Sequence, residues 1–247
     1  MAGSSGIVLQ DRERRLLDAT QSLIVFNRDQ AMEVAGYPSI RRANQRLRQL
    51  VRAGLLRRTF IGSHEAVYWL AGKPARKKNR AENGAAEPAA LFIRHRLEIN
   101  RVHLLVQYRS IPVPGWWFGT WQSFSKPLVA TVPLIPDGYF EVGSPQGIRA
   151  IFVEVDLGTE AVPVLARKAS LYVQLAASGG FTQIFRRNQF RVLIITTSER
   201  RLQNIRQAIA KVTDKLFWLG TLDLISAEKF WTASWHRPTG DQLQSIL

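Results

Sequence analysis

The stretch "IFVEVDLGTE", residues 151–160, constrains the fold most, because it reads as a buried strand that carries two carboxylates. Side chains alternate along a strand, so Glu154 and Asp156 share one face with Phe152 while the remaining apolar residues share the other. Two like charges about 7 Å apart, at about 3.3 Å per residue, are unfavourable on one face of a core strand. The stretch therefore predicts that a metal ion or basic side chains face these acids.

The charge balance indicates a polyanionic partner. The 247 residues include 34 Lys and Arg against 19 Asp and Glu, a net charge of +15, which suits nucleic acid. A basic protein that needs the charge only for solubility is the alternative. The chain has no cysteine, so disulfides and thiolate metal sites are excluded. The sequence starts without a signal peptide pattern and has no long apolar run, which predicts a cytoplasmic protein that does not span a membrane. It also has no phosphate-binding glycine motif, so nucleotide-driven chemistry is not expected.

One segment divides the chain. Residues 72–90, "GKPARKKNRAENGAAEPAA", combine a basic cluster, two prolines and small residues without apolar periodicity, which is typical of a flexible linker. We therefore expect an N-terminal domain over residues 1–71 and a C-terminal domain over residues 91–247.

The N-terminal domain reads as three helices followed by a hairpin, the layout of a winged helix-turn-helix DNA-binding domain. The first helix is expected from about Asp11 to Leu23. Asn27 and Gly36 are a good N-cap and a good stop for the second, and Ser39 can cap a third that ends at Gly54. Two short strands are expected in "LLRRTFIG" and "EAVYWLA".

The third helix has the pattern of a recognition helix. Its apolar stripe is expected at Ile40, Ala43, Leu47, Leu50 and Val51. The opposite face is basic or amide-bearing, without an acid, and Arg and Gln are side chains that read base edges and grip phosphates. The alternative is a small three-helix domain whose charged face is merely solvated. The predicted DNA contacts are Ser39, Arg41, Arg42, Gln45, Arg48 and Arg52, followed in the hairpin by Arg57 and Arg58.

The C-terminal domain alternates helical and strand patterns, which predicts an α/β fold around a central mixed sheet of four or five strands. A long helix over 90–110 is followed by a strand or loop in "WWFGTWQSF" and a turn into a strand in "PLIPDGYFEV". The remaining expected elements are strands in 151–156, 189–198 and 217–226 and helices over 160–177 and 199–216.

Three acids come together if the predicted strands are neighbours. Asp137 lies at the start of one strand, and Glu154 and Asp156 share a face of the next. Carboxylate oxygens suit Mg²⁺, and a hard cation would neutralise acids that otherwise repel one another. Two of the acids have a simpler interpretation, because Asp137 sits in a turn sequence and Asp156 could simply end its strand. Glu154 is the hardest to explain in that way, because it lies within an otherwise apolar run.

A lysine enters from the following helix. Val164, Lys168, Leu171 and Leu175 have helical spacing and are expected to face the sheet. A lysine on an apolar face needs a partner or must extend to solvent, and the acids of the neighbouring strand could be that partner. Tyr172, one turn beyond Lys168, can border the same site.

The order of Asp137, then "VEVD", then a lysine resembles the PD-(D/E)xK nuclease superfamily. More narrowly, a winged helix followed by "HRLEIN", "PDGYFEV", "FVEVDLGTE" and "KASLYVQL" resembles the plasmid replication-relaxation family. The resemblance implies Mg²⁺ or Mn²⁺ bound by Asp137 and Glu154, with Lys168 as a displaced catalytic lysine. His95 and Glu98, on the helix before the sheet, are weaker candidates.

One departure affects the implied activity. The superfamily pattern places Lys two residues after the Glu, where this chain has Asp156. Either Lys168 supplies the amine, with Asp156 as a further catalytic residue that binds metal or orients Lys168, or the domain no longer cuts.

The expected function is thus that of a DNA-binding protein of a plasmid or mobile element, whose winged helix brings a Mg²⁺-dependent endonuclease-like domain to duplex DNA. A non-catalytic regulator of replication or transcription is the alternative. A third interpretation is an adaptor for a relaxase, replication or recombination protein of the same element, through the aromatic residues of "PGWWFGTW". Those aromatics equally suit the core of a small sheet.

Overall fold

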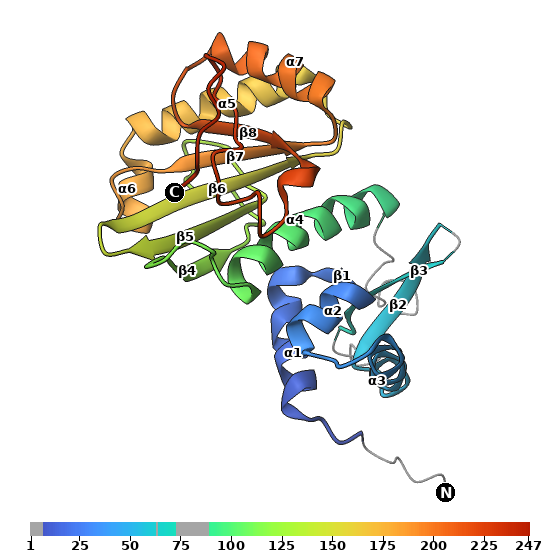
Figure 1. Ribbon diagram of the computed structural model, residues 1–247. Coiled ribbons are helices and arrows are strands. Elements are labelled where there is room, and N and C mark those ends of the chain that lie inside the picture. The colour runs from blue at the N-terminus through green and yellow to red at the C-terminus, as the bar shows by residue number, and fades with distance from the viewer. Residues whose placement is uncertain (1–6, 63, 73–88) are drawn as a thin grey trace, which may run out of the picture. The chain divides into compact units, whose positions relative to one another are not determined.

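The computed structural model describes residues 7–62, 64–72 and 89–247 (Figure 1). The chain divides into two compact units, Met1–Leu104 and Leu105–Leu247. The division lies within helix α4, Ala90–Tyr108, and not in the predicted linker. Most of that linker, residues 73–88, lies outside the described residues.

The N-terminal unit contains the three helices and the hairpin that the sequence predicts, and one additional short strand. The three strands form an antiparallel sheet in the order β1-β3-β2. The elements are α1 (Asp11–Leu23), β1 (Val25–Asn27), α2 (Arg28–Ala35), α3 (Ile40–Arg52), β2 (Leu56–Ile61) and β3 (Glu65–Leu70).

Local caps fix the ends of these helices. The Asn27 side chain accepts a hydrogen bond from the Gln30 N–H at 2.9 Å, and Gly36 closes α2 in the left-handed region at φ +63°. The Ser39 hydroxyl accepts from the Arg42 N–H at 3.2 Å and starts α3. Each cap satisfies a backbone group that the helix end leaves without a partner. The predicted boundaries of α2 and α3 are therefore confirmed to within a residue or two.

The first part of α4 belongs to the N-terminal unit. Gln30 donates a hydrogen bond to the Leu97 carbonyl at 2.9 Å, and Asn100 donates to the Val25 carbonyl at 2.6 Å. Leu104 is buried in the same core as Leu16. The predicted domain 1–71 omitted this helix, because the linker-like composition before it marked the boundary.

The C-terminal unit is built on a five-stranded mixed sheet in the order β4-β5-β6-β7-β8. Neighbours from β4 to β6 are antiparallel, and those from β6 to β8 are parallel. This confirms the predicted α/β class. The strands are β4 (Trp117–Gln122), β5 (Gly138–Ser144), β6 (Gly147–Asp156), β7 (Arg191–Thr196) and β8 (Phe217–Thr221).

Helices cover one face of this sheet. The helices are α5 (Val162–Ala177), α6 (Gly180–Phe185), which was not predicted, and α7 (Glu199–Ala210), which ends before the predicted residue 216. In Figure 1, α5 and α7 lie side by side over the sheet. Phe152 of β6, Tyr172 of α5 and Ile205 of α7 are buried in one core beneath them.

The other face of the sheet is covered in part by the C-terminal segment. Phe140 of β5 contacts Phe230 and Trp231, with ring centroids 6.4 Å and 6.3 Å away. No helix in the described ranges is long and apolar enough to cross a membrane.

Candidate functional site

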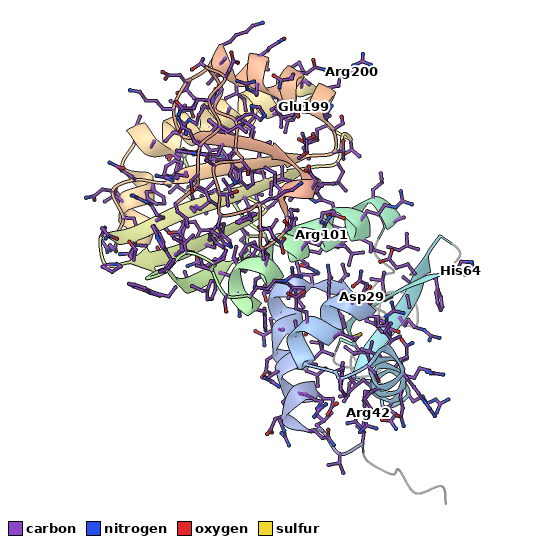
Figure 2. All side chains as sticks on the ribbon, viewed as in Figure 1. Asp29, Arg42, His64, Arg101, Glu199 and Arg200 are labelled. Atoms are coloured by element: carbon purple, nitrogen blue, oxygen red, sulfur yellow. The ribbon has the colours of Figure 1, made fainter. Side chains whose placement is uncertain are left out.

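Helix α3 buries one face and exposes arginines on the other. Ala43, Leu47 and Leu50 are fully buried, as predicted, whereas Ile40 is 52% exposed. The predicted contact residues lie as follows: Ser39, Arg41, Gln45, Arg48 and Arg52 are exposed and Arg42 (Figure 2) is partly exposed. The helix therefore presents a basic surface without an acidic residue between Ile40 and Arg52.

Arg46 of the same helix is structural and was not among the predicted contact residues. Its guanidinium pairs with the fully buried Glu13 of α1, with Nη2 2.9 Å from Oε2. Burial alone would raise the pKa of Glu13, but hydrogen bonds from Arg46 and the Gln10 N–H hold it below its ordinary value. Tyr37 also donates to Glu13. Arg46 therefore fixes α3 against α1.

The hairpin of β2 and β3 adds basic and apolar surface. Arg57 is partly exposed and Arg58 is exposed. The Arg58 guanidinium lies 5.0 Å from the centroid of the Phe60 ring, which is 54% exposed. His64 lies at the tip of the hairpin (Figure 2). This combination of arginine and an exposed aromatic ring is suited to contact with nucleic acid.

Glu154 is buried near the carboxyl end of β6, and both of its carboxylate oxygens accept hydrogen bonds. Lys168 Nζ lies 2.5 Å from Oε2, and the Tyr172 hydroxyl donates to Oε1. Burial raises the pKa of Glu154 to about 7, although Lys168 opposes the shift, and the nearby Asp137 adds to it. The carboxylate that the strand pattern made hardest to explain thus has a direct basic partner.

Lys168 reaches this carboxylate from α5. Burial would lower the pKa of Lys168, but the charges of Glu154 and Asp137 outweigh it and raise the pKa above its ordinary value. Asp137, just before β5, accepts a hydrogen bond from the Val155 N–H at 2.8 Å through Oδ2. The structure thus brings together Asp137 from the bend before β5, Glu154 from β6 and Lys168 from α5.

The sheet-facing stripe of α5 differs from the predicted one. The buried residues are Leu165, Ala169, Tyr172 and Leu175, whereas Val164 is 37% exposed. The buried stripe is displaced because Tyr172 packs into the core of the sheet. Lys168 lies at the edge of that core, with a side chain that is a quarter exposed.

Asp156 has a different partner from the predicted one. Arg201 of α7 binds it with two hydrogen bonds, Nε to Oδ2 at 2.6 Å and Nη2 to Oδ1 at 2.8 Å. Thr196 donates to it at 2.7 Å. Burial would raise the pKa of Asp156, but these bonds hold it below its ordinary value. Asp156 is the last residue of β6, as one interpretation expected, and it is joined to Arg201. The alternative in which it orients Lys168 is therefore not supported.

Arg201 was missed, although a signal for it exists. Strands β6 and β7 are parallel, with Asp156 opposite Thr196, and α7 begins at Glu199, three residues after Thr196. The first turn of α7 therefore lies at the same edge of the sheet as Asp156. A basic residue there was a candidate partner for the second acid of the strand.

The remaining candidates do not join these acids into a larger cluster. Within residues 7–62, 64–72 and 89–247, no three His, Asp or Glu side chains lie close enough together to hold a metal ion. Glu98 pairs with Arg101 at 2.6 Å, and both it and His95 belong to the N-terminal unit. In the aromatic segment, Trp117 is 50% exposed, while Trp121 stacks on Phe140. The aromatic side chains of this segment are therefore only partly buried in the core.

Comparison with known proteins identifies the family. The sequence pattern of the replication-relaxation family matches residues 22–189. The chain belongs to the replication-relaxation family, and the match supports a role related to replication. No curated protein matches this sequence. Among solved structures, it is similar to the restriction endonuclease FokI, with 10% sequence identity and a TM-score of 0.36. The likeness covers 87% of this chain and 43% of that chain.

Proposed function

We propose that this protein binds duplex DNA through α3 and the hairpin of β2 and β3. The observation that carries the proposal is the surface of α3, where Arg41, Arg48 and Arg52 are exposed. Arg46, which points to the core, is the one arginine of the helix with an acidic partner, Glu13, among the described residues. The exposed arginines are thus available for phosphates and base edges.

The experiment compares two double variants that remove the same charge. Arg41→Ala with Arg48→Ala removes two cations from α3, and Arg14→Ala with Arg15→Ala removes two exposed cations from α1. Binding to duplexes selected from a random library, and to random-sequence duplex, is measured over a range of salt concentrations. The α3 variant should lose affinity for the selected duplexes more than for random ones, and its slope of log K against log salt should fall by about 2. Equal losses in the two double variants contradict the proposal.

A second candidate function, phosphodiester hydrolysis by the C-terminal unit, is favoured by the grouping of Asp137, Glu154 and Lys168. Two carboxylates are a donor set that Mg²⁺ accepts together with waters and phosphate. In this arrangement both oxygens of Glu154 and one of Asp137 already accept hydrogen bonds. A cation would share these oxygens, each of which has a second lone pair. The oxygen donors of Asp137 and Glu154 are therefore of the type that Mg²⁺ binds.

The chemistry divides between the metal and the chain. Bound Mg²⁺ would polarise a phosphate and supply hydroxide at neutral pH. The raised pKa of Lys168 keeps its amine protonated, so Lys168 serves to stabilise charge on a phosphate oxygen and not to accept a proton from water. Glu154 pairs with that ammonium, and the charge of Asp137 stabilises its protonated form.

The test is nicking of supercoiled plasmid in Mg²⁺ or Mn²⁺. Asp137→Ala, Glu154→Ala and Lys168→Ala should each abolish cleavage and leave DNA binding unchanged. Arg167→Ala, which removes an exposed cation beside Lys168, is the matched control and should cut normally. A wild-type protein that binds DNA but cuts no supercoiled, linear or single-stranded substrate would instead be a regulator of replication or transcription.

A further inference from the structure

A cavity of about 650 Å³ opens at the amino ends of β6, β7 and β8. Its lining includes five cationic side chains: Arg149, Arg187, Arg191, Lys215 and Arg237. None of the described residues that line it is Asp or Glu. Neither the predicted DNA contacts nor the acidic site includes any of these residues.

The strand register gathers the charges. Arg191 lies opposite Ile151 in the parallel pair of β6 and β7, and Trp218 lies opposite Leu193 in the pair of β7 and β8. Side chains two residues apart share a face, so Arg149, Arg191 and Trp218 all project from the same face at this end of the sheet. Glu154 projects from the opposite face of β6, about 17 Å further along the strand at about 3.3 Å per residue. The lining of the cavity includes none of Asp137, Glu154 and Lys168, so the cavity is separate from the acidic site.

Two of the arginines pack on one tryptophan. The guanidinium of Arg237 lies 3.6 Å from the ring centroid of Trp218, and that of Arg191 lies 4.6 Å away. Arg191 donates to the carbonyl of Ile246, and Arg237 Nη2 donates to the carbonyl of Asp214 at 3.1 Å. Arg191 Nη1 also donates to an oxygen of Leu247 at 3.4 Å, and the charge of Asp214 opposes the lowering of the Arg237 pKa by burial. These contacts and the indole hold the two guanidinium groups in place, and neither group forms an ion pair with a carboxylate side chain in the described structure.

Within the described structure, one of the five cations of the cluster forms an ion pair with a carboxylate side chain. Arg187 pairs with Glu141, but in the described structure no ion pair joins Arg149, Arg191, Lys215 or Arg237 to an acidic side chain. Arg237 Nη1 is buried without a hydrogen-bond partner. A buried donor of this kind costs free energy unless an acceptor reaches it.

The electrostatics of Arg191 agree with this geometry. Burial, followed by the charges of Arg149 and Arg237, lowers its pKa to about 10. By contrast, Arg46 and Arg201 each gain a carboxylate hydrogen bond that raises their pKa. The cluster therefore holds cations under mutual repulsion, which a bound anion would relieve.

We propose that this cavity binds phosphate groups of a DNA strand and so gives the C-terminal unit a DNA contact of its own. The planar fork of Arg matches phosphate oxygens, and Thr182, Asn188 and Gln189 add polar groups to the lining. The volume lies within the range of ligand pockets, roughly 300–1,000 Å³, and exceeds what a single phosphate needs. The proposal rests on DNA as the partner, the proposed function above.

The first test uses pyrophosphate and the full chain. Pyrophosphate should raise the melting temperature of the wild type, because it neutralises the cluster. The pocket variant, Arg149→Ala with Lys215→Ala, removes two exposed cations and should lose at least half of that rise. The control variant, Lys126→Ala with Arg200→Ala (Figure 2), removes two exposed cations elsewhere on the same unit and should keep it. An equal rise in all three proteins, or none in the wild type, overturns the site.

The second test uses random-sequence duplex and single-stranded DNA over a range of salt concentrations. For the pocket variant, the slope of log K against log salt should fall by about 2 on the duplex or on the single strand, depending on which of the two the cavity contacts. For the control variant the slope should stay unchanged on both. A pocket variant that loses the pyrophosphate response but keeps the wild-type slope on both DNAs overturns the DNA contact and leaves a site for small phosphate compounds. The pyrophosphate response does not involve α3, so a failure of the α3 variants to affect DNA binding would contradict the proposed function and not this site.

Discussion

Lys168 Nζ lies 2.5 Å from Glu154 Oε2, and the Tyr172 hydroxyl donates to the other oxygen of the same carboxylate. The ammonium is thus the counter-ion of a carboxylate that the strand buries among apolar residues. Asp137 is close enough to raise the pKa of both groups. An acid–lysine pair of this kind is stable without a metal, yet it leaves lone pairs on both acids for one.

Replacing Lys168 with Met should destabilise the protein in a pH-dependent way. At pH 8 the variant leaves an ionised Glu154 buried without its counter-ion, which should lower the free energy of unfolding by up to about 3 kcal/mol. This value is the low end of the range for breaking a buried ion pair, because Lys168 is partly exposed. At pH 5 the cost should be smaller, since Glu154 is then protonated. Denaturant unfolding at the two pH values measures both costs.

The matched control is Arg167→Met, on the same turn of α5 but exposed. It should change the free energy of unfolding by less than about 0.5 kcal/mol at either pH. Equal destabilisation by Lys168→Met at pH 5 and pH 8 would mean that its aliphatic packing, and not its charge, matters.

Glu154 and Asp156, two residues apart on β6, should affect stability over opposite pH ranges. The pKa of Glu154 is raised from 4.5 to about 7, so its contribution to stability is present below pH 4.5 and is lost as the pH rises to 7. The pKa of Asp156 is lowered from 3.8, so its contribution is present above pH 3.8 and is lost as the pH falls through the lowered value.

Neutral variants separate the two contributions. In EDTA, Glu154→Gln should flatten the fall in melting temperature between pH 4.5 and pH 7, and Asp156→Asn should flatten the fall below pH 3.8. Asp156→Asn should also lower the melting temperature at pH 7, because Arg201 then loses its ionised partner. If the melting temperatures of the two variants changed with pH in the same way, the opposite pH ranges assigned to Glu154 and Asp156 would be ruled out.

Much of the fold could be predicted because its signals are local. Asn27, Gly36 and Ser39 delimit helices through their own capping bonds, and alternation along 151–156 correctly placed Glu154 and Asp156 on one face. Strand β1 and helix α6 were missed because they are short, at three and six residues, and offer too few positions for a periodic pattern.

The partners within the site depend on tertiary structure and could be predicted only in part. Spacing along α5 brought Lys168 and Tyr172 towards the acids, but it could not place Arg201, which reaches Asp156 from 45 residues away. The same limit applies to Arg46, whose partner Glu13 lies on another helix. The spacing of a charged residue along a helix does not show whether its side chain faces solvent or a partner on another element.

Arg46 and Arg48 of α3 should therefore respond in opposite ways to substitution. Arg46→Met leaves Glu13 buried without its cation and should cost about 3–5 kcal/mol of unfolding free energy. Arg48→Met should be nearly neutral for stability, since Arg48 is exposed, yet should weaken DNA binding. Thermal melts and DNA titrations of both variants check this. A DNA-binding loss in a fully folded Arg46→Met protein, with none in Arg48→Met, would reverse the two roles.

The final prediction tests whether the two acids also accept a metal. Mn²⁺ should raise the melting temperature of the wild type, because an ion that binds only the folded state at 100 times its dissociation constant adds about 2.7 kcal/mol. Asp137→Asn should lose most of this gain, since it removes one of two carboxylates. Asp156→Asn should keep it, because Arg201 and Thr196 already occupy that carboxylate. Lys168→Met should enlarge it, since Mn²⁺ then no longer shares Glu154 with an ammonium. A response equal in Asp137→Asn and the wild type, or one lost only in Asp156→Asn, would place the metal elsewhere.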